Sequence, residues 1–370
     1  PIFVPVRIQP KRCIIYYYYC YYCFYLRAFY RLSNPPPPKS FALPTSHSPM
    51  GQEHSRARRL KVVSPRLRAF EQTSDCPTTF TTEHTYENKQ SNFRWIEGRR
   101  YHDVKGVTYF LPEDDREADR LHQLNFLLKE VFGENIMSSA QDCLRTGTRI
   151  LDVGCGPGTW ILDLATEHPQ VEFVGIDIAN MFPETIRPAN VDFVKANVLE
   201  GLPFDEEFDL VQMRNMDMAF LETEWPEVIR EIYRVLKPGG YIQLMEGGDF
   251  VTEDPEAEKF IKNICRVLSA REQDPSVCKK LAELEKQAGF EVIQDEALSI
   301  PCGWNGTVGN LMLDDMREMA LGAMPVLAMA LGMDNQDYIN YIDSTMSKFA
   351  ASEACRIMHV AVGRKPEIQT

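Results

Sequence analysis

Between residues 148 and 248, short apolar segments alternate with helical ones, and this alternation constrains the fold more than any other feature of the sequence. The apolar segments TRILDVGC, VEFVGIDI, VDFVKANV, FDLVQMRNM and YIQLMEGG have the length and composition of buried strands. Helical stretches such as TWILDLATEHP and PEVIREIYRVLKPGG lie between them. The pattern predicts a mainly parallel sheet with right-handed crossovers. Ligands of such a sheet bind at the carboxyl ends of its strands.

Further elements flank this alternating region. Residues 115–135 place leucines at helical spacing on one face, and Gly133 ends that helix. Two more strands are predicted, one in FEVIQDEALSIP (290–301) and one in ACRIMHVAVGRKP (354–366). They bring the predicted sheet to seven strands.

The stretch between those last two strands is rich in Met, Leu and Ala and is too long for a plain loop. We predict that it forms cap helices at about 305–350, joined by another cap helix at about 253–270. Its methionines are expected mainly to pack in the core rather than to form a binding surface. The sequence therefore predicts a Rossmann-like, doubly wound α/β domain over 93–370, with a helical cap insertion.

The first part of the chain, 1–92, is predicted to be a disordered, low-complexity extension. Its tyrosine-rich stretch 14–30 is shorter than the ~20 residues that span a bilayer. Met50 is a candidate translation start, and Gly51 and Ser55 would then fit the pattern for N-myristoylation. The alternative is a chance match in a solvated tail. Membrane contact is expected only if Gly51 is myristoylated.

Charge and cysteine content narrow the function classes. The formal net charge of -13 argues against broad nucleic-acid binding, which favours a basic surface. The ten cysteines are scattered, and Cys20 and Cys23 form a CxxC without a second pair at zinc-finger spacing. We expect reduced thiols, no bound metal, and a cytoplasmic or nuclear protein.

The turn after the first strand is glycine-rich and carries neither common phosphate signature. It reads Gly154-x-Gly156-x-Gly158, with Thr159 where a dinucleotide fingerprint has glycine, and it lacks the Gly-Lys-Ser/Thr end of a P-loop. The glycines let the backbone approach a ligand closely, and the following helix offers free amide groups to a carboxylate. Asp152, just before the turn, offers a negative charge to a cation.

Asp177 ends the second strand of the predicted sheet. A carboxylate at this position can accept both hydroxyls of a ribose and would repel a ribose phosphate. Taken alone, Asp177 is better explained as a helix cap. Combined with the turn and Asp152, it indicates a nucleoside that has an amino-acid tail and no phosphates, which describes S-adenosylmethionine.

These motifs resemble class I S-adenosylmethionine-dependent methyltransferases over roughly residues 100–300: LDVGCGPGTW, VGIDI, VKANVLEGLPFDEEFDLVQMRNM and VLKPGGYIQLMEGG. Within that class, EGRRYHDVKGVTYFLPEDDREADRLHQLNFLL and the tail CGWNGTVG…VAVGRKP are similar to fungal methyltransferases of the LaeA type, which include regulators of secondary metabolism. The resemblance implies methyl transfer to a small-molecule or protein acceptor. It also implies further cofactor-binding residues, namely Tyr101, Tyr109, Ile178, Asn197, Val198 and Arg214. Asn197 stands where the family often has Asp, and its carbonyl oxygen can still accept a hydrogen bond from adenine.

No catalytic residue follows from the sequence. Glu246 and His102 are candidates for a base, which is needed only if the acceptor loses a proton during attack. Two alternatives stay open. One is a cofactor-binding regulatory protein that acts through protein partners without efficient turnover. The other is a nucleotide-dependent oxidoreductase on a similar sheet, against which Thr159 counts.

Overall fold

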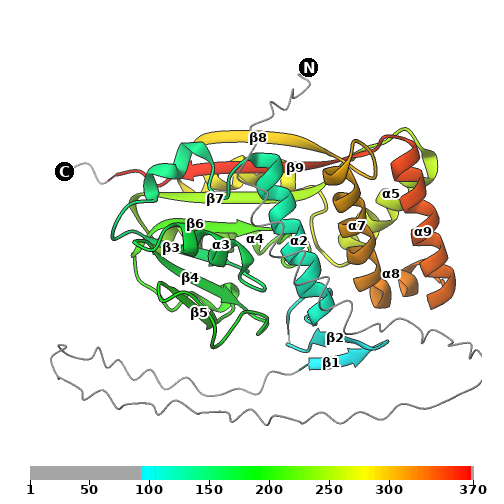
Figure 1. Cartoon of the computed structure of the whole chain (residues 1–370), viewed down its shortest axis with the longest axis horizontal. Coiled ribbons are helices and arrows are strands. Elements are labelled where there is room, and N and C mark those ends of the chain that lie inside the picture. The colour runs from blue at the N-terminus through cyan, green and yellow to red at the C-terminus, as the bar shows by residue number, and fades with distance from the viewer. Residues whose placement is uncertain (1–92, 105, 368–370) are drawn as a thin grey trace, which may run out of the picture. The chain divides into compact units, whose positions relative to one another are not determined.

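A seven-stranded sheet forms the centre of the computed structural model, which describes residues 93–104 and 106–367 (Figure 1). Its spatial order is β5-β4-β3-β6-β7-β9-β8. The strands from β3 to β7 run parallel, whereas β9 pairs antiparallel with both β7 and β8. The predicted mainly parallel, seven-stranded α/β sheet is therefore confirmed. The strand bounds are β3 (Arg149–Val153), β4 (Glu172–Asp177), β5 (Val191–Lys195), β6 (Phe208–Arg214), β7 (Leu236–Val251), β8 (Glu291–Pro301) and β9 (Cys355–Arg364).

The predictions made for 1–92 lie outside the described residues. They include the CxxC of Cys20 and Cys23, the start at Met50 and the acylation of Gly51. Among the residues that the structure does describe, no helix is long and apolar enough to cross a bilayer.

Helices cover both faces of the sheet. One face packs against α2 (Asp115–Phe132) and α3 (Thr159–Glu167), with Trp160 fully buried. The other packs against α4 (Trp225–Val235) and α6 (Leu281–Ala288), with Trp225 fully buried. The predicted helix 226–240 ends at Val235 because the chain turns directly into β7, where Leu236 pairs with Phe208. The short 3-10 helices are η1 (Ser138–Cys143), η2 (Val198–Glu200) and η3 (Val277–Lys280).

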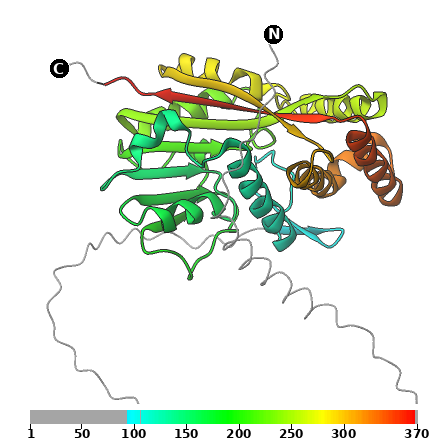
Figure 2. The same cartoon turned by 45° about the horizontal axis from the view of Figure 1, so that its top comes forward.

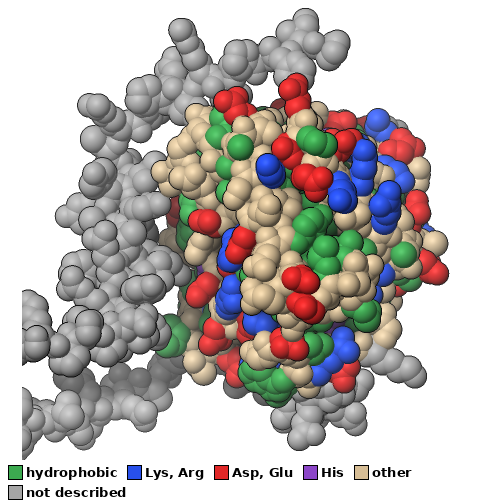
Figure 3. Space-filling view, turned by 90° about the vertical axis from the view of Figure 1, so that its right-hand side faces the viewer, with side chains coloured by type: hydrophobic (Ala, Val, Ile, Leu, Met, Phe, Trp, Pro, Cys, Tyr) green, Lys and Arg blue, Asp and Glu red, His purple; other side chains and the backbone are tan. Residues whose placement is uncertain are grey.

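Four helices stand beyond the carboxyl end of the parallel strands, as Figures 1 and 2 show. They are α5 (Pro255–Ala270), α7 (Thr307–Gly322), α8 (Met324–Leu331) and α9 (Asn335–Ala351). Met312, Met316 and Met346 are buried in their core, which fits the expected packing role. Figure 3 shows acidic, basic and apolar side chains interspersed over the face that carries α9.

A buried cluster of charges joins α2 to the cap and the sheet. Arg120 of α2 lies between Glu117 of the same helix and Asp315 of α7, to which its Nη1 donates at 2.7 Å. Arg356 of β9 approaches the other oxygen of Asp315 at 3.4 Å. Removing one member of such a cluster would leave a buried charge without a partner. The cluster therefore fixes the position of α2 over the sheet edge.

A hairpin precedes α2. Its strands are β1 (Phe93–Ile96) and β2 (Arg99–His102). Arg99 Nε donates to Asp114 Oδ2 at 2.6 Å, and Asp114 also caps α2 by accepting from the Glu117 amide. These bonds hold the segment between β2 and α2 at both of its ends.

Candidate functional site

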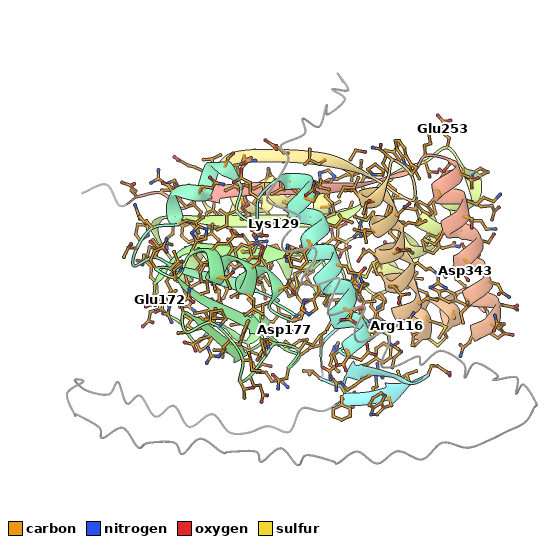
Figure 4. The ribbon with its side chains drawn as sticks, viewed as in Figure 1. Arg116, Lys129, Glu172, Asp177, Glu253 and Asp343 are labelled. Carbon is orange, nitrogen blue, oxygen red and sulfur yellow. The ribbon has the colours of Figure 1, made fainter. Side chains whose placement is uncertain are left out.

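A cavity opens at the carboxyl ends of β3, β4 and β6, where the strand order reverses between β4 and β6 on either side of β3. This is the position that the topology of a doubly wound sheet favours for a ligand. Figure 4 shows Asp177 at this edge, near α2. The structure brings together around the cavity most of the residues predicted from the sequence: Tyr109, Asp152, Gly154, Gly156, Asp177, Ile178, Asn197, Val198 and Arg214.

The glycine turn is held against β4 by hydrogen bonds. The amides of Gly154 and Cys155 both donate to the Ile176 carbonyl at 2.9 Å. The Gly156 amide donates to Asp177 Oδ2 at 2.8 Å, and the Ala179 amide donates to Asp177 Oδ1 at 2.8 Å. The loops after β3 and β4 are therefore joined through one carboxylate, and their shape is fixed before any ligand arrives.

Asp177 keeps acceptor capacity beyond these two bonds. A carboxylate has about four lone-pair positions, and two of them face backbone amides here. Burial raises the pKa of Asp177, while the amide donors and Lys195 oppose that rise. Further donors, such as sugar hydroxyls, would favour the ionised form.

Asp152 and Arg214 form a second polar region of the cavity. Burial raises the pKa of Asp152 to about 7, with Arg214 lowering it and Asp177 adding to the rise. Burial also lowers the pKa of Arg214, which Asp152 opposes. Both groups lie where an opposite charge on a ligand would offset the cost of their burial.

Asn125 of α2 completes this region, and sequence reasoning missed it. Its Oδ1 accepts from Arg214 Nη2 at 2.5 Å, whereas its buried Nδ2 has no partner among the described residues. A buried donor without an acceptor is costly, so a ligand acceptor would satisfy it. The available signal was position: Asn125 stands four residues after Leu121, on the predicted apolar face of the helix.

Thr159 begins α3 beside this region and lines the same cavity. Its Oγ1 lies 2.5 Å from His122 Nδ1 of α2. Thr159, at the start of α3, thus lines the same cavity as Asn125 and Arg214. Together they make this end of the cavity suitable for an anionic group.

Two predicted residues lie outside the cavity lining. Tyr101 is 4% exposed and its hydroxyl donates to the Gly322 carbonyl of α7 at 2.9 Å, so it anchors the hairpin to the cap. Gly158 has φ 75° and caps α3, and a Cβ there would come within 2.4 Å of the Phe193 ring. Gly158 is thus required for packing between the turn and β5.

Glu246, a candidate base, also lies outside the lining. It is 0% exposed, and both of its oxygens accept from the Met216 amide at 2.9 Å. One oxygen also accepts from the Asp217 amide at 3.1 Å. Glu246 therefore holds the loop after β6, and these bonds leave it poorly placed to take a proton from a ligand.

The wall opposite the glycine turn comes from the segment before α2. His102, Tyr109 and Glu113 all line the cavity from this side. The rings of His102 and Tyr109 stack with centroids 5.7 Å apart and an interplanar angle of 23°. Glu113 was not predicted from the sequence. It faces Arg100, with 3.5 Å between Arg100 Nε and its Oε1.

Asn197 caps η2, and its Oδ1 accepts from the Leu199 amide at 3.1 Å. A carbonyl oxygen has two lone pairs, so one remains for a ligand donor. Ile178 and Val198 flank this position in the lining. The three residues form an end of the cavity with apolar sides and a single acceptor, which suits a heteroaromatic base with an exocyclic amine.

Comparison with known proteins gives the following findings. Residues 150–240 match the family described as "Methyltransferase domain". The methyltransferase pytC of Aspergillus terreus is 29% identical over 240 residues, covering 62% of this chain and 70% of pytC. The N-methyltransferase verN of Clonostachys rogersoniana is 29% identical over 279 residues, covering 70% of this chain and 93% of verN. The secondary metabolism regulator laeA of Aspergillus fumigatus is 34% identical over 154 residues, covering 40% of this chain and 39% of laeA.

Proposed function

We propose that this chain, which carries a methyltransferase domain and is similar to fungal methyltransferases and to LaeA-type regulators, binds S-adenosylmethionine in the cavity and transfers its methyl group to an acceptor. One observation carries the proposal. The cavity has a ribose-type carboxylate, Asp177, and is also lined by Asp152 and by Asn125, whose buried amide donor has no partner among the described residues.

The donor set fits the cofactor group by group. Asp177 would accept the ribose hydroxyls, and Asn197 would accept from the adenine amine. Asp152 would pair with the ammonium of the methionine end. The carboxylate at that end would accept hydrogen bonds from the free Nδ2 of Asn125 and from the Arg214 guanidinium. Both donors lack an anionic partner among the described residues.

S-adenosylmethionine, when bound, supplies an electrophilic methyl group on a sulfonium. The chain's own residues then have two tasks, namely to align the acceptor and to keep the site dry. Leu121, Leu124 and Phe220 supply apolar lining for the second task. The Tyr109 ring can attract a sulfonium by cation–π interaction, worth about 0.5 to 2 kcal/mol.

The function that we favour is methyl transfer to a small-molecule or protein acceptor, because verN and pytC are methyltransferases whose similarity to this chain extends over most of their own lengths. Secondary metabolism is the setting that the laeA match supports. The same match favours a second candidate function, that of a cofactor-binding regulator acting through protein partners. In both cases we expect no direct contact with nucleic acid and a cytoplasmic or nuclear location.

Calorimetric titration tests the shared part of the proposal. We expect S-adenosylmethionine and S-adenosylhomocysteine to bind at micromolar concentrations and NAD not to bind. Tight NAD binding without S-adenosylmethionine binding would reverse the proposal in favour of an oxidoreductase. A screen of small molecules for release of S-adenosylhomocysteine then separates the two candidates. Binding without turnover on any acceptor would favour the regulator.

A further inference from the structure

His102 is a buried imidazole that faces the cavity and is not hydrogen-bonded. It ends β2, is 7% exposed and lines the cavity opposite the glycine turn. Across 93–104 and 106–367, no group donates to or accepts from its ring nitrogens, in contrast to His122, which bonds to Thr159. A ring nitrogen left free in a buried site is available to a ligand.

The segment that carries the neighbouring wall is fixed in place. Thr108 Oγ1 donates to the Ala219 carbonyl at 2.9 Å, and Arg271 Nη2 donates to the Thr108 carbonyl at 2.6 Å. Tyr109 follows directly and stacks on His102. The Tyr109 ring, and not a hydrogen bond, therefore orients the imidazole. Its ring nitrogens remain free.

The electrostatic surroundings keep this imidazole neutral. Burial lowers the pKa of His102, the Arg94 charge on β1 lowers it further, and only Asp103 opposes the shift. A neutral imidazole can accept a proton. Tyr109, the other titratable group in contact with the ring, stays protonated because burial raises the pKa of its hydroxyl.

The other carboxylates in the lining are engaged elsewhere. Asp177 accepts two backbone amides, and Glu113 faces Arg100. Glu224 accepts from the Leu221 amide at 2.7 Å. Asp152 is assigned to the ammonium of the cofactor under the proposed function, and the Arg214 charge lowers its pKa. Among the described residues that line the cavity, His102 is therefore the base with a free proton-accepting atom and no competing partner.

We propose that His102 is the general base of the methyl transfer, and that the acceptor attacks through a hydroxyl or amino group that carries a proton. This inference rests on the proposed function. In the step, a lone pair of the acceptor oxygen or nitrogen forms the new bond to the methyl carbon. The carbon–sulfur bond breaks and its electrons remain on sulfur, while the proton of the acceptor goes to a free nitrogen of His102.

The proposal narrows the acceptor class. Tyr109 stacks on His102, and Val107 and Phe220 add apolar lining to the same cavity. Glu113, which lines this side, already faces Arg100, so a permanently cationic acceptor would find no unpaired counter-ion there. The acceptor is therefore a largely apolar molecule whose oxygen or nitrogen is uncharged once it has gained the methyl group and lost its proton.

The test is an NMR titration of the histidine rings in the full chain, with S-adenosylhomocysteine bound and then with S-adenosylmethionine bound. His102→Gln identifies the His102 signal by its disappearance, and His359 of β9, which lies outside the cavity lining, is the internal control. The two ligands differ by one positive charge at sulfur. A unit charge within about 10 Å, at an effective dielectric constant of roughly 40, shifts a pKa by about half a unit.

We expect His102 to titrate below its ordinary pKa in both complexes, and about 0.5 unit lower with S-adenosylmethionine than with S-adenosylhomocysteine. His359, whose pKa burial also lowers, should titrate identically in both. If both ligands bind and His102 titrates identically, the base assignment is overturned while the proposed function stands. If neither ligand binds, the proposed function fails and this inference fails with it.

Discussion

The two walls of the cavity differ in how their polar groups are satisfied. On the wall made by the ends of β3 and β4, the turn amides and the Asp177 carboxylate already bond to one another. On the wall made by α2 and the segment before it, the Asn125 amide and the His102 imidazole have free polar atoms. The first wall is preorganised to hold a ligand, whereas the second is incomplete until something binds.

The difference suggests that the two walls contribute to different steps, the first to cofactor binding and the second to the reaction of the acceptor. The strand-end wall places a rigid set of acceptors and glycines, so changes there should alter affinity strongly. The helical wall contributes single unsatisfied groups, so changes there should have smaller effects on affinity and larger effects on what happens to the acceptor. The following experiments test this difference between the two walls, beginning with the largest expected effect.

Gly156→Arg places a long side chain in the lining of the strand-end wall. We expect affinity for S-adenosylhomocysteine to fall by more than about 100-fold, since overpacking of this kind costs about 3 kcal/mol. Gly147→Arg is the matched control: Gly147 also has positive φ, 82° against 53°, and a Cβ there would meet nothing within 4 Å. Calorimetry and unfolding curves are measured for both. Equal loss of binding in the two variants would contradict a site at the turn.

Asp177→Ala removes the carboxylate that joins the loops after β3 and β4. We expect affinity to fall by about 30-fold, or roughly 2 kcal/mol, through lost ribose hydrogen bonds. The free energy of unfolding should also fall by about 1–2 kcal/mol, because the Gly156 and Ala179 amides lose their acceptor. Asp192→Ala on the exposed side of β5 is the control and should leave affinity unchanged. Unchanged binding in Asp177→Ala would show that the ribose lies elsewhere.

The pH dependence of binding tests Asp152, whose pKa of about 7 is raised by burial. Between pH 5.5 and 8 this group ionises, so affinity for a ligand ammonium should rise by about tenfold over that range. The stability of the unliganded protein depends on pH in the opposite direction. The raised pKa of Asp152 contributes stability that is fully present below the ordinary Asp pKa near 4 and is lost as the pH rises through 7.

Asp152→Asn should therefore flatten the binding profile, and at pH 8 it should raise the melting temperature of the free protein. The comparison is made by calorimetry and by thermal unfolding at the two pH values. A variant that keeps the wild-type pH profile would assign the dependence to another group.

Asn125→Leu tests the helical wall and should have the smallest effect. We expect affinity to fall by about 3- to 5-fold, because one neutral hydrogen bond to the ligand carboxylate is lost. The free protein should lose about 1–2 kcal/mol of stability, because the buried Arg214 Nη2 loses its Oδ1 acceptor, whereas the loss of Nδ2, which has no partner, costs nothing. Asn135→Leu is the contrast, because Asn135 donates to Asp163 at 2.6 Å and lies outside the lining. It should lose stability and keep affinity.

The strand-end wall is the part that the sequence predicts well. The glycine turn and Asp177 are local features, and their meeting follows from parallel strands that end at one edge. The mainly parallel sheet is likewise predictable in outline, because the alternation of strands and helices determines it, whereas the place of β9 between β7 and β8 does not follow from that alternation.

The helical wall is harder to predict because distant residues position it. Arg120, Asp315 and Arg356 fix α2, yet they are separated by up to 236 positions in the numbering. The sequence also does not tell which side chain of β2 faces the cavity. Successive residues of a strand point to opposite faces, so Tyr101 and His102 cannot both face the cavity. The register of the hairpin sends His102 to the cavity and Tyr101 to α7. Sequence resemblance alone assigned Tyr101 to the cofactor.

The position of β9 between β7 and β8 has a consequence for biosynthesis. Strand β8 has β9 as its neighbour in the sheet, so it has no ladder partner until residues 355–364 have left the ribosome. A nascent chain that pauses in the cap helices exposes two unpaired strand edges, which are templates for aggregation. Synonymous codon changes that slow translation across 305–350 should therefore reduce the soluble yield more than the same changes placed before residue 290.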